Sequence, residues 1–120
     1  MLEFANTSRD IGLKSEAMSL RYLFINGYTP LLGRSKFLGI EVDQLALDQQ
    51  SRLCLFEVKS LSSSFYQGQR VSRQQYLRLR RVRSYLQKHL RIPVLLKFSF
   101  VKDLSRVEII DELHFKPLRY

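Results

Sequence analysis

The sequence predicts a single α/β domain in which helices flank a mixed β-sheet. The chain has 120 residues, which is the size of one domain. Helical and extended patterns follow one another in the order helix, three strands, helix, two strands (αβββαββ), which is typical of this fold class. A hydrophobic content of 45% with 26% charged residues is enough to build a core. We therefore expect residues 1–120 to form one domain.

The first predicted helix covers residues 7–26. Thr7 or Ser8 offers an N-cap, and Asn26-Gly27 ends the helix. Apolar residues recur at helical spacing, so we expect an inner stripe, flanked by Leu23, that consists of Leu13, Ala17, Leu20 and Phe24.

The second predicted helix starts after an N-cap at Ser72 and runs to about residue 90. The same spacing rule gives it a core face of Leu79, Val82, Leu86 and Leu90. The opposite side of this helix gathers basic residues: Arg73, Arg80, Arg81, Lys88 and Arg91.

Apolar and alternating runs predict five strands, at residues 29–37, 40–48, 52–60, 94–101 and 107–110. The first is interrupted by Gly33 and is expected at an edge of the sheet. A short polar segment joins the second and third strands, so a hairpin is expected there. The serine-rich segment 61–70 predicts a mobile loop.

The charge of the chain is strongly positive. Its 20 Lys and Arg residues outnumber 11 Asp and Glu residues, for a net charge of +9. Eight basic residues and no acidic residue stand between Arg70 and Arg91. Such a stripe attracts a polyanion and makes binding depend on salt. A solvated helix face, an acidic protein or a membrane surface are alternatives, but nucleic acid is favoured because no acidic residue balances the stripe.

Composition disfavours several other classes of protein. The single cysteine, Cys54, excludes an internal disulfide and a cysteine-based zinc site, and we expect it to be buried as an apolar filler. No apolar run approaches the roughly 18 residues of a membrane span, and no secretory signal is visible. A cytoplasmic protein without membrane contact is therefore expected. His89 and His114 are isolated, and no glycine-rich phosphate loop is present.

Charged residues stand at core-facing positions of the predicted hairpin. Because successive strand side chains alternate faces, Glu57 and Lys59 point to the same side as two leucines of their own strand. With a turn centred on Gln50, Asp43 lies opposite Glu57. The same register places Glu41 opposite Lys59, at a Cβ separation of about 4.5–5.5 Å. Two facing carboxylates repel each other unless a proton or a cation lies between them.

Both helices add polar groups to the same edge of the sheet. Glu16 falls at the border of the first helix's apolar stripe, so its side chain is expected against the sheet or along its margin. Gln75 lies one turn before Leu79, so its amide is expected to face inward. Each residue taken singly has an ordinary explanation as a solvated or weakly paired side chain. Together, three carboxylates and one lysine beside a basic helix indicate a site.

This set of residues suits metal-dependent phosphodiester hydrolysis. Mg²⁺ prefers oxygen ligands and is usually held by one or two carboxylates with waters and substrate phosphate. Asp43 and Glu57 meet this description for Mg²⁺ or Mn²⁺, with Glu16 as a further ligand or a residue that positions water. Such an ion polarises a phosphate and lowers the pKa of bound water. Lys59 would stabilise the developing charge, or orient and deprotonate the water.

The pattern of Asp43, thirteen intervening residues and Glu57-Val58-Lys59 resembles the PD-(D/E)XK signature of the restriction-endonuclease-like nuclease superfamily. Four segments are similar to the YraN-like family of small bacterial proteins: GLKSEAMSLRYLFINGY, IEVDQLALD, LCLFEVKS and FYQG. The resemblance covers roughly residues 10–100. It implies a restriction-endonuclease-like core with an active-site set of Glu16, Asp43, Glu57 and Lys59. Holliday-junction resolvases of archaeal type are the nearest functional analogy, and that analogy suggests a homodimer.

The chain departs from the family pattern at five positions near the proposed site. Ile40, Ser35 and Leu61 replace a typical glycine, asparagine and basic residue, and Gln75 replaces a typical lysine. Gln44 stands where an apolar residue is common. These changes affect positions that contact substrate in the family.

Three functions remain open at this point. The first is a nuclease acting on DNA rather than RNA, including branched or structured DNA. The second is a non-catalytic nucleic-acid-binding module with the same fold, and the third is a protein-interaction domain. The candidate catalytic residues are Glu16, Asp43, Glu57, Lys59 and Gln75. The candidate metal ligands are Asp43, Glu57 and Glu16. The candidate nucleic-acid-binding residues are Arg34, Lys36, Arg70, Arg73, Arg80, Arg81 and Lys88.

Overall fold

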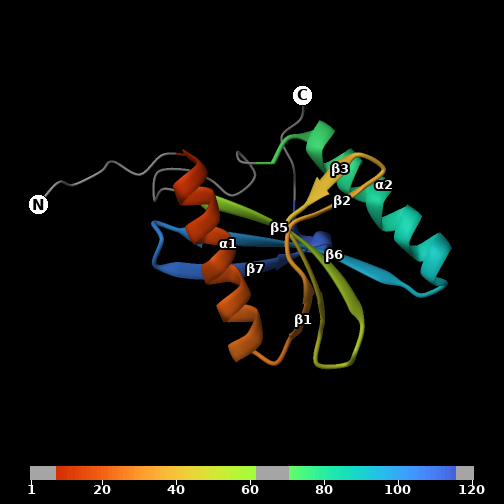
Figure 1. Cartoon of the computed structure of the whole chain (residues 1–120), viewed down its shortest axis with the longest axis horizontal. Helices are drawn as coiled ribbons and strands as arrows, with labels where there is room; N and C mark the ends of the chain where they lie inside the picture. Colours follow the sequence, from red (N-terminus) through yellow and green to blue (C-terminus); the bar gives the residue numbers. More distant parts are fainter. Residues whose placement is uncertain (1–7, 62–70, 116–120) are drawn as a thin grey trace, which may run out of the picture.

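The computed structural model describes residues 8–61 and 71–115. In chain order the elements are α1 (Ser8–Ile25), β1 (Thr29–Leu32), β2 (Ser35–Phe37), β3 (Ile40–Val42), β4 (Gln44–Leu47), β5 (Leu53–Leu61), α2 (Arg73–Leu90), β6 (Val94–Lys102), β7 (Arg106–Asp111) and the short 3₁₀ helix η2 (Glu112–His114). A five-stranded sheet in the order β1-β4-β5-β6-β7 forms the middle layer (Figure 1). Its neighbouring strands are antiparallel except β5 and β6, which are parallel. The two strands β2 and β3 form a separate antiparallel ladder.

The two faces of the main sheet are covered by different helices (Figure 1). On one face Leu55 of β5 belongs to a buried cluster with Leu79 of α2. On the other face Cys54 and Phe56 of the same strand are buried together with Leu23 of α1. Burial on both faces explains why β5 is almost continuously apolar. The predicted α/β class, with a mixed sheet flanked by helices, is confirmed, as is the burial of the free thiol of Cys54.

The buried face of α1 differs from the predicted one. The four residues of the expected inner stripe are exposed to solvent: Leu13, Ala17, Leu20 and Phe24. The face that meets the sheet instead carries Ser15, Ser19 and Leu23, which follow one another at intervals of one helical turn and are buried. Hydrophobic spacing misses this face because two of its three members are small polar residues.

Two of the predicted strands are each divided in two. Residues 29–37 form β1, which is an edge strand of the main sheet, and β2, which is not part of it. Residues 40–48 break at Asp43 into β3 and β4. Leu38 and Gly39, with φ angles of 55° and 74°, make the tight turn between β2 and β3. The result is a small hairpin that leaves the main sheet.

The β2–β3 hairpin changes the partner of Glu41. This residue pairs with Lys36 of β2, so the prediction that it lies opposite Lys59 is wrong. The register of the β4–β5 hairpin is as predicted, with Gln44 opposite Phe56. The β4–β5 ladder therefore begins at Gln44, and Asp43, the residue before it, is not part of the ladder.

The helix α2 begins where the sequence predicts. Ser72 is its N-cap: Ser72 Oγ accepts from the backbone N–H of Gln75 (3.1 Å), and Gln75 Oε1 accepts from the backbone N–H of Ser72 (3.2 Å). These reciprocal bonds satisfy two amides at the helix start. The predicted core face is confirmed for Leu79, Val82 and Leu86. Leu90 was expected to join it but is 50% exposed, because the helix ends there and Arg91 turns into the left-handed region.

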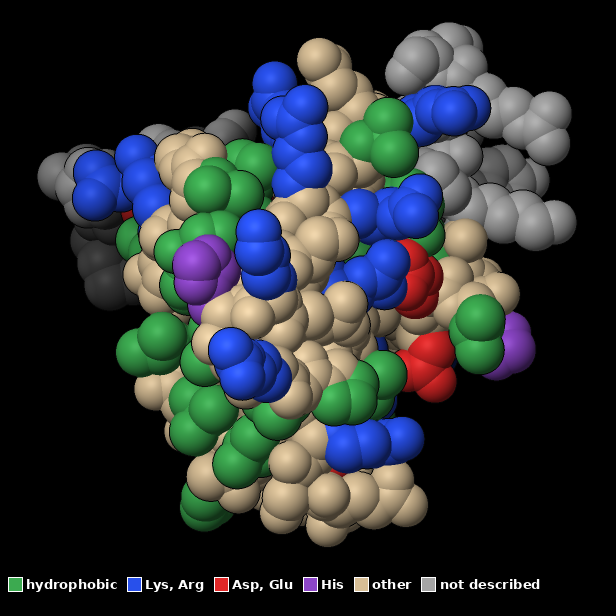
Figure 2. Space-filling view, turned by 90° about the vertical axis from the view of Figure 1, so that its right-hand side faces the viewer, with side chains coloured by type: hydrophobic (Ala, Val, Ile, Leu, Met, Phe, Trp, Pro, Cys, Tyr) green, Lys and Arg blue, Asp and Glu red, His purple; other side chains and the backbone are tan. Residues whose placement is uncertain are grey.

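The outward side of α2 carries the basic stripe. Figure 2 shows this side of the molecule, with Lys and Arg side chains spread over it and few acidic side chains, most of them on the right of the view. The candidate binding residues of α2 that the structure describes are all exposed: Arg73, Arg80, Arg81 and Lys88. Lys36 is also exposed, on β2.

Some predictions fall outside the described residues. These are the cap at Thr7, the role of Arg70 and the loop at 62–70. Leu61, which was expected to begin that loop, instead ends β5 and is buried. None of the helices in the described ranges is long and apolar enough to cross a membrane.

Candidate functional site

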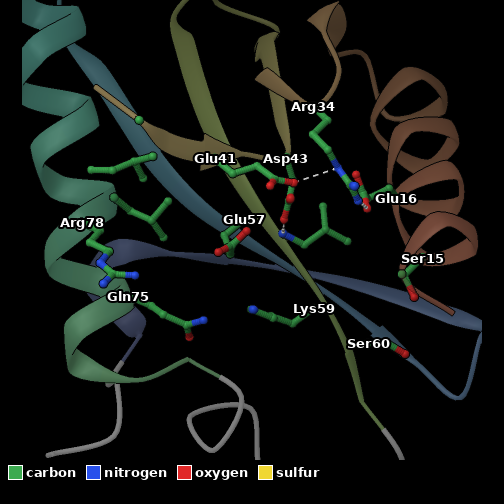
Figure 3. A pocket seen from close by; sticks show the side chains of 15 residues that line it. Ser15, Glu16, Arg34, Glu41, Asp43, Glu57, Lys59, Ser60, Gln75 and Arg78 are labelled. Atoms are coloured by element: carbon green, nitrogen blue, oxygen red, sulfur yellow. Dashed lines mark hydrogen bonds and ion pairs between the residues drawn. The ribbon is translucent and has the colours of Figure 1, made fainter. Parts of the chain in front are cut away.

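A pocket of about 640 Å³ opens between α1, the β2–β3 hairpin, β5 and α2. All five candidate catalytic residues line it: Glu16, Asp43, Glu57, Lys59 and Gln75 (Figure 3). They come from four different parts of the fold, so only tertiary structure brings them together. The sequence predicted that these side chains converge at one edge of the sheet; the structure brings them to one pocket, beside the central strand β5.

Asp43 and Glu57 form the centre of this pocket. Asp43 stands at the break between β3 and β4, where no ladder constrains it, and its Oδ2 accepts a hydrogen bond from the backbone N–H of Val58 (2.7 Å). This bond ties Asp43 to β5 at the residue that follows Glu57. The two carboxyl groups therefore face each other from neighbouring segments (Figure 3).

The surroundings of Glu57 disfavour its charged form. Burial raises the pKa of the Glu57 carboxyl well above its usual range, and the hydrogen bond and like charge of Asp43 raise it further. Lys59 acts in the opposite direction but does not offset these effects. The two neighbouring carboxyl groups of Asp43 and Glu57 would repel each other if both were charged, so a proton or a cation between them stabilises the pair. Hard divalent cations accept this kind of oxygen donor set, so the residues present fit Mg²⁺ or Mn²⁺.

Glu16 lines the pocket, but its carboxylate forms an ion pair with Arg34. Its Oε2 accepts from Nη2 of Arg34 at 2.5 Å, and Nε of Arg34 also lies 2.9 Å from Oε1 of Glu41. The hydrogen bond to Glu16 and the nearby carboxylates raise the pKa of Arg34. Within residues 8–61 and 71–115, no three His, Cys, Asp or Glu side chains are grouped as a metal site. The predicted set of three metal-binding carboxylates is therefore not assembled.

Arg34 itself was predicted to bind nucleic acid. The structure gives its guanidinium two carboxylate partners, from α1 and β3, so much of its charge is already balanced. Its role in the described structure is to connect these two elements at the rim of the pocket.

Gln75 points into the pocket, as its position on α2 predicts. Because its Oε1 caps the helix through the Ser72 amide, its –NH₂ group is turned toward Lys59 (Figure 3). Arg78, one turn further along α2, also lines the pocket and was not among the predicted site residues. The signal was present in the sequence, since residues three apart on a helix share a face.

A buried polar network fixes α1 beneath the pocket. Ser19 Oγ donates to Gln44 Oε1 (2.9 Å) and shares a hydrogen bond with Ser99 Oγ (2.7 Å). Gln44 Nε2 in turn donates to the backbone carbonyl of Glu16 (2.7 Å). These bonds connect β4 and β6 to the turn of α1 that carries Glu16. Gln44 was noted in the sequence only as a departure from the family pattern, and its structural role was missed.

Comparison with known proteins gives a consistent picture of the fold. No family model matches this sequence, and no curated protein is significantly similar to it. A structure of an EndoMS–dsDNA complex matches with a TM-score of 0.54 and 19% identity, covering 81% of this chain and 37% of that chain. A repair endonuclease from Pyrococcus abyssi matches with a TM-score of 0.53 and 13% identity, covering 85% of this chain and 41% of that chain.

The chain has the fold of these endonucleases. It spans well under half of the length of either one. At these identities the likeness establishes the fold, so the chemistry of the pocket has to be argued from its own residues.

Proposed function

We propose that this protein is a metal-dependent nuclease that hydrolyses phosphodiester bonds in DNA, including branched or structured DNA. The observation that carries the proposal is the convergence of Asp43, Glu57, Lys59, Glu16 and Gln75 on one pocket. The fold supports it, because one of the two similar structures named above is a complex with double-stranded DNA and the other is a repair endonuclease. The PD-(D/E)XK spacing and the resemblance to the YraN-like family support it as well.

The pocket residues divide the chemistry between them. Asp43 and Glu57 would hold Mg²⁺ or Mn²⁺, which supplies a Lewis acid for the phosphate and lowers the pKa of a bound water. Lys59 lies on the same strand and face as Glu57, so its ammonium can meet the negative charge that develops on the phosphate. Gln75 and Arg78 line the same pocket, so the –NH₂ of Gln75 and the guanidinium of Arg78 would donate hydrogen bonds to substrate oxygens. The exposed basic residues of α2 would hold the rest of the nucleic-acid backbone.

A second candidate function is a nucleic-acid-binding module without catalysis. The specific observation that favours it is the ion pair of Glu16 with Arg34, which keeps the third carboxylate from joining Asp43 and Glu57. If the protein is such a binding module, the basic surface of α2 is the part that binds nucleic acid.

A cleavage assay separates the two candidates. Purified protein is incubated with duplex, single-stranded and branched DNA and with RNA of the same sequence, in Mg²⁺, Mn²⁺ or EDTA. The nuclease proposal predicts metal-dependent cleavage that falls at least about 100-fold in Asp43→Asn and Glu57→Gln. The matched control is Glu108→Gln, which neutralises a carboxylate of β7 that pairs with Lys102 of β6 and should cleave normally.

Each result of this assay is decisive. Cleavage that persists in both site variants would remove Asp43 and Glu57 from the mechanism. Binding without cleavage in any metal would establish the second candidate instead.

A further inference from the structure

A second hollow lies on the outward side of α2, next to the candidate active site. It has a volume of about 600 Å³, and we call it the α2 groove. Its apolar residues are Leu38, Leu77 and Tyr85, and its basic residues include Arg80, Arg81 and Lys88. None of the described residues that line it is acidic. The groove thus combines an apolar floor with a positive rim that no acidic residue of its described lining balances.

The apolar floor of the groove includes two large side chains that are exposed to solvent. Leu38 is 61% exposed at the tip of the β2–β3 hairpin, and Leu77 is 42% exposed on α2. The ring of Tyr85 lies 4.3 Å, centroid to centroid, from the imidazole of His89, which also lines the groove. The Tyr85–His89 ring pair and the two leucines offer contact area for a planar apolar group.

The groove adjoins the candidate active site on two elements. Leu38 in the groove is followed along the chain by Gly39 and Ile40, which line the active-site pocket. Leu77 in the groove is followed by Arg78, which also lines the pocket. The pocket and the groove are therefore built from the same hairpin tip and the same stretch of α2.

We propose that the α2 groove binds an unpaired, single-stranded segment of the nucleic acid whose adjoining part occupies the active-site pocket; this inference rests on the proposed function. An unpaired nucleotide presents an exposed base face and a phosphate together, which matches the apolar floor and the basic rim. A duplex offers phosphates to the rim but keeps its base faces stacked, so the apolar floor gains no contact from it. Sequence-independent recognition of single strands generally combines these two features. An acidic peptide would satisfy the rim, but the continuity with the active-site pocket favours nucleic acid.

Fluorescence anisotropy in EDTA, where cleavage is absent, tests this inference. The three probes are a blunt DNA duplex, the same duplex with a single-stranded tail, and the same duplex with an abasic tail. The abasic tail keeps the phosphates and lacks the bases. The proposal predicts about 5- to 10-fold tighter binding of the natural tail than of the other two probes, as expected for the stacking of about one base.

Matched variants locate the effect. Leu38→Asn combined with Leu77→Ala should abolish the preference for the natural tail and leave binding of the blunt duplex unchanged. Asn tolerates the positive φ of position 38, which limits damage to the fold. The control combines the same changes elsewhere: Leu104→Asn at another positive φ, and Leu113→Ala at a leucine that is 92% exposed. Circular dichroism checks that both variants fold.

Several results would overturn the inference. These are equal binding of the natural and abasic tails, a preference that survives the groove variant, or displacement of the tail by polyglutamate at matched charge concentration. Failure of the proposed function is distinguishable from these. A tail preference without metal-dependent cleavage refutes the nuclease and leaves the groove, whereas cleavage without a tail preference refutes the groove alone.

Discussion

The turn between β4 and β5 depends on a single buried carboxylate, and its removal should destabilise the whole protein. Asp48 is 2% exposed at its side chain. Its Oδ1 accepts from the backbone N–H groups of Gln50 and Arg52, both at 2.9 Å, and its Oδ2 accepts from Nε of Arg52 at 2.7 Å. This turn sets the hairpin register that brings Asp43 beside Glu57. We therefore expect its loss to affect stability first.

The magnitude follows from the three bonds. Each backbone N–H bond contributes about 1 kcal/mol net. The ion pair with Arg52 adds less than about 1 kcal/mol because Arg52 is largely exposed. Asp48→Ala should thus lower the free energy of unfolding at pH 7 by about 2–3 kcal/mol. Asp48→Asn keeps an oxygen for the two backbone bonds and should lose about 1 kcal/mol.

The same residue makes a prediction about pH. Burial alone would raise the pKa of Asp48, but the hydrogen bonds from Arg52 and Gln50 outweigh it and hold this pKa below its usual range. Because the folded pKa is depressed, the stabilisation is complete above the unfolded pKa of about 3.9 and is lost as the pH falls through the folded pKa. The difference in free energy of unfolding between wild type and Asp48→Asn should therefore shrink as the pH falls from about 5 to about 2, a range that spans the unfolded pKa.

Urea unfolding followed by circular dichroism measures both effects. Asp111→Ala is the control, because Asp111 is an exposed carboxylate 3.4 Å from Lys97 and should cost less than about 1 kcal/mol. The reasoning fails if Asp48→Ala unfolds within about 0.5 kcal/mol of wild type, or if the gap between wild type and Asp48→Asn is the same at every pH.

Four further substitutions, in α1 and just after it, make three more predictions. Leu23→Ala, at a fully buried position of α1, should lower the free energy of unfolding by about 2–5 kcal/mol, measured with urea. Phe24→Ser, on the exposed side, should lower it by less than about 0.5 kcal/mol. The opposite order would mean that the stripe predicted from hydrophobic spacing is the buried face. Ser19→Ala leaves the buried Gln44 amide short of a partner and should cost about 1–3 kcal/mol, with faster amide hydrogen exchange in α1 as a second readout. Gly27→Ala should cost at least about 1 kcal/mol by thermal or urea unfolding, since its φ is +87° and a Cβ would lie 3.0 Å from Gln49 Cγ; a neutral effect would contradict this strain.

The sequence by itself determined the class of the fold and much of the candidate site. Apolar patterns located α2 and the long strands β5 and β6, because these elements bury apolar residues at regular positions. The apolar spacing in α1 located the helix but not its buried face. The register of the β4–β5 hairpin followed from a short polar turn. That register is what predicted Asp43 beside Glu57, since a shift of one residue would send their side chains to opposite faces.

Only the tertiary structure decided how α1 meets the sheet. The helix buries Ser15 and Ser19 beside Leu23 and leaves Leu13 and Leu20 exposed, because the hydroxyl of Ser19 finds partners on β4 and β6 and small side chains allow close approach. Such partners lie 25 and 80 residues away along the chain, so no local pattern reports them. The same holds for Glu16, whose bond to Arg34 depends on the position of the β2–β3 hairpin. Local spacing fixes which residues share a face, whereas which face is buried and which carboxylate is already paired depend on contacts between distant segments.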